Sequence, residues 1–91
     1  MTDTKLLVGS LSNDLFRVAN LAQRGSSIGA IRFLKEAKRW AQPLKLQSVP
    51  EYVRNIATTI SQESSTKIST SQAERYLMYG ILLQNYALHS K

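Results

Sequence analysis

The pattern of residues 28–44 constrains the fold of this 91-residue chain more than any other feature. At the roughly 100° per residue of an α-helix, its apolar side chains gather on one side and its cations on the other. The apolar side consists of Ala30, Ile31, Phe33, Leu34, Ala37, Trp40 and Ala41. Arg32, Lys35 and Arg39 lie opposite, within roughly 60° of one another, and are named the basic face. This segment is predicted to be an amphipathic helix that covers a core with its apolar side.

A helix is also predicted for residues 4–24, where apolar residues recur at intervals of three and four. Asp3 is a candidate N-cap for a helix of this length, and Ser12 is a candidate for a shorter one. Gly25 follows as a suitable C′ residue. The sequence leaves the start of this helix open but indicates its end.

The amphipathic helix is expected to span residues 27–42, with Ser26 or Ser27 as its N-cap. Its end is placed before Pro43, because the residue preceding a proline is disfavoured in the helical region. The short connection to the first helix predicts that the two helices are antiparallel neighbours.

A third helix is predicted for residues 49–61. Ser48 and Glu51 have the spacing of a capping box, and Pro50 suits the first turn, where its missing N–H costs nothing. An apolar stripe of period 3.6 follows these signals.

Residues 61–70 are rich in serine and threonine and are predicted to form an exposed loop. Ser71 and Glu74 repeat the capping-box spacing and open a last helix over residues 71–88. No sustained alternation of period two predicts a strand. The expected fold is therefore all-α, a single compact domain over residues 1–91 that forms a bundle of about four helices.

Composition narrows the class of protein. The hydrophobic content of 43% suits a globular chain, and the absence of cysteine excludes disulfides and thiolate metal sites. The N-terminus lacks the pattern of a signal peptide, and the longest apolar run, residues 76–83, is too short to span a bilayer. We expect a soluble cytoplasmic protein with no membrane association.

The positive charge is concentrated in one part of the chain. Residues 17–45 contain a single acid, Glu36, and the seven cations Arg17, Arg24, Arg32, Lys35, Lys38, Arg39 and Lys45. This segment therefore carries the whole net charge of +6. Such a concentration indicates an anionic partner. The candidate contact residues are Arg32, Lys35, Lys38, Arg39 and Lys45.

Two classes of partner fit these residues: an acidic protein surface, or a nucleic acid bound mainly through non-specific phosphate contacts. The first two helices could form a helix-turn-helix, but the N-terminal end of the second, Ile28–Gly29–Ala30, has nothing to read a base edge. Phe33 and Trp40 are expected in the core rather than stacked on bases. A basic face that contacts only solvent is the remaining alternative.

Catalysis finds no support, and no cofactor or metal site is expected. Glu51 and Glu74 have capping roles, and Glu36 can pair with Arg32 one turn before it. The single histidine, His89, lies near the C-terminus. No carboxylate pair, phosphate loop or nucleophile motif remains. We expect a non-enzymatic interaction or regulatory module.

The last predicted helix is apolar nearly all round, which is typical of an enclosed helix. The alternative is that part of it stays exposed and mediates self-association, as a two-fold dimer. Tyrosines suit an interface with one wet edge, and glycine allows another backbone to approach. The candidates for self-association are Tyr76, Tyr79, Gly80, Leu83 and Tyr86.

Overall fold

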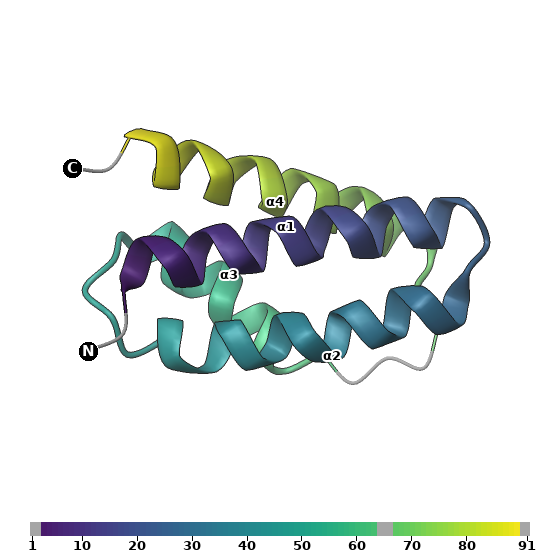
Figure 1. Ribbon diagram of the computed structural model, residues 1–91, viewed down its shortest axis with the longest axis horizontal. Coiled ribbons are helices and arrows are strands. Elements are labelled where there is room, and N and C mark those ends of the chain that lie inside the picture. The colour runs from purple at the N-terminus through teal and green to yellow at the C-terminus, as the bar shows by residue number, and fades with distance from the viewer. Residues whose placement is uncertain (1–2, 64–66, 90–91) are drawn as a thin grey trace.

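The computed structural model describes residues 3–63 and 67–89, which contain four α-helices and no β-strand. These are α1 (Thr4–Gln23), α2 (Ser27–Leu44), α3 (Glu51–Ser61) and α4 (Thr70–His89). Helix α1 lies in the middle: α2 packs against one side of it and α4 against another, while α3 packs against α2 (Figure 1). The fold is therefore the all-α bundle that the sequence predicts.

The ends of α1 follow from local chemistry. The Asp3 carboxylate accepts a hydrogen bond from the backbone N–H two residues on, so the helix begins there and not after Ser12. At the other end, Gly25 adopts a positive φ of 84°. The backbone N–H of Ser26 donates to the carbonyl of Leu21 at 2.8 Å, as in a Schellman motif. This turn directs α2 back along α1.

The predicted end of α2 at residue 42 is wrong, because the helix continues through Pro43 to Leu44. Proline removes one backbone hydrogen bond, but here only in the last turn of the helix. The Leu44 side chain is fully buried in the core cluster. We attribute the two additional residues to this burial, which outweighs the local preference of the residue before proline.

The predicted capping box at the start of α3 is also wrong. The N-cap is Pro50, whose ψ of 154° is extended, and the helix begins at Glu51. Ser48 therefore lies two residues before the N-cap, too early for its hydroxyl to cap the first turn.

Helix α4 does open with a capping box, but one built by Ser69 and Gln72 instead of Ser71 and Glu74. The Ser69 hydroxyl accepts from Gln72 N at 3.1 Å, and Gln72 Oε1 accepts from Ser69 N at 2.9 Å. Of the loop predicted before it, residues 64–66 lie outside the described residues. Ala73, in the first turn of α4, is fully buried.

Helix α4 is a peripheral helix, so of the two alternatives for it, an enclosed helix and one that stays partly exposed, the structure shows the second. Only four of its twenty residues are buried, against eight of twenty in α1. The four form one stripe that packs on α1: Ala73, Tyr76, Gly80 and Leu83. α1 is the element that occupies the middle of the bundle, because it has neighbours on two sides.

The crossing of α1 and α4 is close at Gly80. The Ser12 hydroxyl donates a hydrogen bond to the Gly80 carbonyl at 2.7 Å. A Cβ at position 80 would lie 2.8 Å from the Phe16 ring. An added methyl group would therefore require the Phe16 ring to shift.

We expect Gly80→Ala to lower the free energy of unfolding by about 1 kcal/mol, because the clash with Phe16 exceeds the gain in helix propensity. Gly9→Ala is the matched control, because Gly9 lies inside α1 with no atom within 4 Å of an added Cβ. This variant should gain about 0.5–1 kcal/mol. Urea denaturation measures both changes. Equal gains from the two substitutions would show that Phe16 moves aside without cost.

Candidate functional site on helix α2

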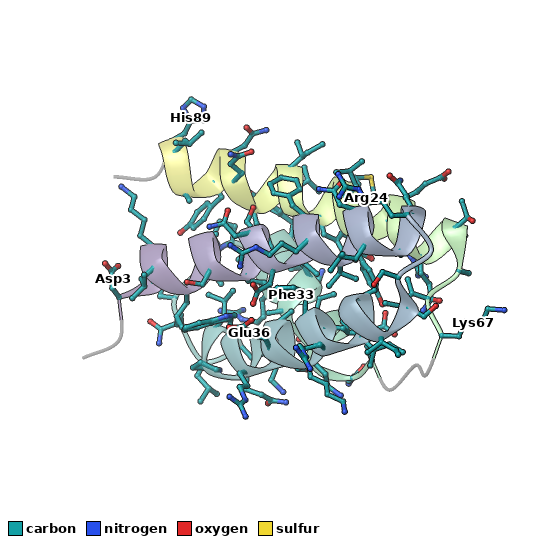
Figure 2. All side chains as sticks on the ribbon, turned by 45° about the vertical axis from the view of Figure 1, so that its right-hand side comes forward. Asp3, Arg24, Phe33, Glu36, Lys67 and His89 are labelled. Carbon is teal, nitrogen blue, oxygen red and sulfur yellow. The ribbon has the colours of Figure 1, made fainter. Side chains whose placement is uncertain are left out.

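The basic face lies on the side of α2 that is turned away from α1. Arg32, Lys35 and Arg39 are all exposed, because the buried residues of the helix occupy its opposite side. Nitrogen-tipped side chains project along this outer edge of α2 in Figure 2. Among the described residues, none of the three cations has an ion-pair or hydrogen-bond partner. Their charge is therefore available to another molecule.

The other two candidate contact residues differ from these three. Lys38 is half-buried, and its Nζ donates a hydrogen bond to the backbone carbonyl of Glu63, just after α3. Lys45 is half-buried at the C-cap of α2. Lys38 thus serves to tie α2 to the end of α3, and the structure groups only three of the five cations on one open surface.

An isoleucine shares the surface with the cations. Ile28 lies one helical turn before Arg32, and 83% of its surface is exposed. Together with the half-buried Ile31, it lines a shallow depression bordered by Arg32 and Lys35. A second depression, lined by Glu36 and all three residues of the basic face, continues along the helix. Helical periodicity could have placed Ile28 here, but our sequence reasoning missed it.

The expected ion pair between Glu36 and Arg32 is not among the ion pairs of the described residues. Glu36 instead lies at the seam between α1 and α2, as Figure 2 shows. It lines a small polar depression with Asp14 and Trp40. Asp14 and Glu36 are far apart along the chain and come near each other only in the fold, so no local sequence pattern could predict this carboxylate pair.

Asp14 ties α1 to α2. One carboxylate oxygen accepts a hydrogen bond from Trp40 Nε1 at 3.0 Å, and the other accepts from Arg17 at 3.4 Å. The Arg17 guanidinium in turn lies over the Phe33 ring, 5.3 Å from its centroid. These contacts hold α2 at one rotation about its axis, and that rotation turns the basic face outward.

Burial raises the pKa of the Asp14 carboxyl above its ordinary value of 3.8, and the neighbouring Glu36 carboxylate raises it further. The hydrogen bond from Trp40 and the charge of Arg17 act in the opposite direction. Both Asp14 oxygens are already occupied by groups of the same chain. This carboxylate therefore has a structural role in orienting α2.

The residues expected to mediate self-association lie toward the interior. Tyr76, Gly80 and Leu83 are buried, while Tyr79 and Tyr86 are half-buried and pack against the core. Burial, and then the nearby Glu63 carboxylate, raises the pKa of the Tyr76 phenol well above its usual range. A second copy of the chain could not reach the three buried residues without opening the core.

No helix in the described part of the chain is long and apolar enough to cross a membrane. The same residues contain no group of three or more histidine or carboxylate side chains that could hold a metal ion. No protein-family model, curated protein or solved structure matches the chain. Its function must therefore be inferred from its own residues.

The contacts that join Asp14 to Trp40 and Arg17, and Arg17 to Phe33, are named the Asp14 network. They predict an effect on stability. Asp14→Ala should lower the free energy of unfolding by about 1–3 kcal/mol, because the Trp40 N–H loses its acceptor. Asp14→Asn keeps an oxygen that can accept the Trp40 hydrogen bond but has no ionisable carboxyl group. Because the pKa is raised in the folded state, lowering the pH from 7 towards about 4 should stabilise the wild type relative to Asp14→Asn. Parallel pH dependence in urea denaturation of both proteins would contradict the raised pKa.

Proposed function

We propose that the protein is a small non-enzymatic interaction module that presents the basic face of α2 to an acidic protein partner. The observation that carries the proposal is the set of three exposed cations that have no ion-pair or hydrogen-bond partner within residues 3–63 and 67–89. They lie on a helix whose rotation is held by the Asp14 network. A fixed helix loses little freedom when it binds, so more of the interaction free energy is kept as affinity.

The partner's surface can be described from this geometry. Residues 28–42 span about 21 Å at the rise of an α-helix, which matches three to four turns of a partner helix. Carboxylates at intervals of three and four on that helix would meet Arg32, Lys35 and Arg39. An apolar side chain near one end would cover Ile28 and enter the depression beside Ile31. We infer an acidic amphipathic helix as the preferred occupant.

A nucleic acid is the competing class of partner, and two observations disfavour it. The exposed isoleucine beside the cations has no favourable contact on a phosphate backbone. Phe33 and Trp40 are engaged with Arg17 and Asp14 at the seam with α1, so neither aromatic is placed to stack on a base. An acidic protein surface that also carries an apolar side chain would contact both the cations and the exposed isoleucine of this face.

The proposal predicts that the double variant Arg32→Glu, Arg39→Glu keeps its fold, since exposed charges contribute about 0–1 kcal/mol each. Its affinity for an acidic amphipathic helical peptide should fall at least about tenfold, which two reversed contacts can account for. Fluorescence anisotropy with a labelled peptide measures the loss, and circular dichroism verifies the fold.

The matched control is Lys5→Glu, Arg75→Glu, which changes the net charge equally on exposed positions of α1 and α4. This control should bind the peptide nearly as well as the wild type. If both double variants lost the same affinity for the peptide, the loss would come from the change in net charge alone. That result would overturn the assignment of the site to the basic face. Tighter, steeply salt-dependent binding to random-sequence duplex DNA would favour the nucleic-acid class instead.

A further inference from the structure

The outer face of α4 is apolar, although no other helix covers it. Leu77, Met78, Ile81, Leu82 and Leu88 are between 37% and 70% exposed. At about 100° per residue they spread over an arc of roughly 140° beside and opposite the buried stripe that packs on α1, and Glu74, Asn85 and His89 lie within the same arc. We name these five residues the outer face of α4. A helix that is apolar on two opposite sides needs a second contact surface.

We propose that the outer face of α4 binds a second copy of this chain, as an antiparallel two-fold pair of α4 helices. The occupant is a second copy because α4 carries exposed Glu74 near its start and His89 near its end, so two antiparallel copies bring a hydrogen-bond acceptor beside a donor at each end. Two-fold pairing is the commonest closed arrangement of identical chains. The proposal uses no residue of α2 and does not depend on the partner proposed above.

The exposed area fits a small dimer. The exposed fractions of the five side chains amount to roughly 450 Å² of apolar surface, the size of the largest apolar patch on a typical monomer, which is often functional. A specific interface buries about 800 Å² on each partner, with an apolar centre and a polar rim. Gln84 and Asn85, both exposed on α4, would supply part of the remaining polar area.

The polar groups at the ends of the face select the antiparallel orientation. Glu74 is exposed near the start of α4 and His89 near its end, and the midpoint between them falls between Ile81 and Leu82. His89 projects from the last turn, away from α1 (Figure 2). An antiparallel partner centred on this midpoint places each Glu74 beside the His89 of the other copy. A parallel partner would place the two Glu74 carboxylates together.

The helix dipoles favour the same orientation, because antiparallel helices bring the positive end of one beside the negative end of the other. Repulsion between the basic faces of the two copies would not weaken this pairing. α2 and α4 pack on different sides of α1, so the two α2 helices lie at the far ends of the dimer (Figure 1).

Sedimentation equilibrium of the full chain tests the proposal. At about 100 µM, a concentration suited to an interface of this size, the mass should be twice the monomer mass of 10.2 kDa. Ile81→Asp should restore the monomer mass with unchanged helicity, because the two introduced carboxylates would face each other at the centre. Leu46→Asp is the control: Leu46 is 87% exposed after α2, and this variant should still dimerise.

Cysteine cross-linking tests the orientation, because the chain has no cysteine of its own. Ile81→Cys should form a disulfide with its own copy under mild oxidation. Glu74→Cys alone should not, but a mixture of Glu74→Cys and Leu88→Cys chains should form the mixed disulfide. A monomer mass for the wild type at every concentration would overturn the proposal. Efficient self-linking of Glu74→Cys would overturn the antiparallel arrangement.

Discussion

The position of α1 between α2 and α4 is the constraint on which the rest of this structure depends. A 20-residue helix with neighbours on two sides takes up much of the apolar surface that the other helices can offer. α4 therefore buries one side only, and α2, which packs on both α1 and α3, still keeps an open outer side. The two open sides differ in chemistry: that of α2 carries cations, and that of α4 carries leucine, isoleucine and methionine.

Buried polar contacts, in addition to apolar packing, determine how these neighbours are oriented. On one side of α1, Asp14 accepts from the Trp40 indole; on another, the Ser12 hydroxyl donates to the Gly80 carbonyl. A buried polar group that loses its partner costs more free energy than the bond contributes, so each contact penalises rotation or sliding of its helix. Apolar packing alone tolerates such movements more easily. The exposed surfaces of α2 and α4 are thus fixed from inside the bundle.

Periodicity was sufficient to locate the four helices, because each carries an apolar stripe that repeats every three or four residues. The helix ends were less predictable, because neighbouring signals compete. Ser69 and Ser71 both begin a plausible capping box, and the structure forms the hydrogen bonds of the first with Gln72. Leu44 extends α2 past a proline because its side chain is buried in the core. The second outcome depends on tertiary contacts that a local pattern does not contain.

The residues of the candidate site were likewise predictable only in part. Helical spacing alone grouped Arg32, Lys35 and Arg39, since one helix carries all three. It could not show that Lys38 is bound to Glu63 or that Glu36 lies beside Asp14, because these contacts join separate helices. Nor could it show which side of α4 faces α1. An apolar residue looks the same in a sequence whether it meets the core or solvent.

The attachment of α4 has a consequence for how the chain moves. α4 packs mainly on α1, with an edge-to-face contact between Tyr86 and Tyr52 of α3, whereas α1, α2 and α3 form a continuous series of neighbours. Detaching α4 would leave that series intact, so α4 is suited to open as a cooperative unit of its own. Its backbone amides would then exchange with solvent before those of α1. Because its outer side also carries apolar residues, an opened α4 would expose apolar side chains on both of its sides.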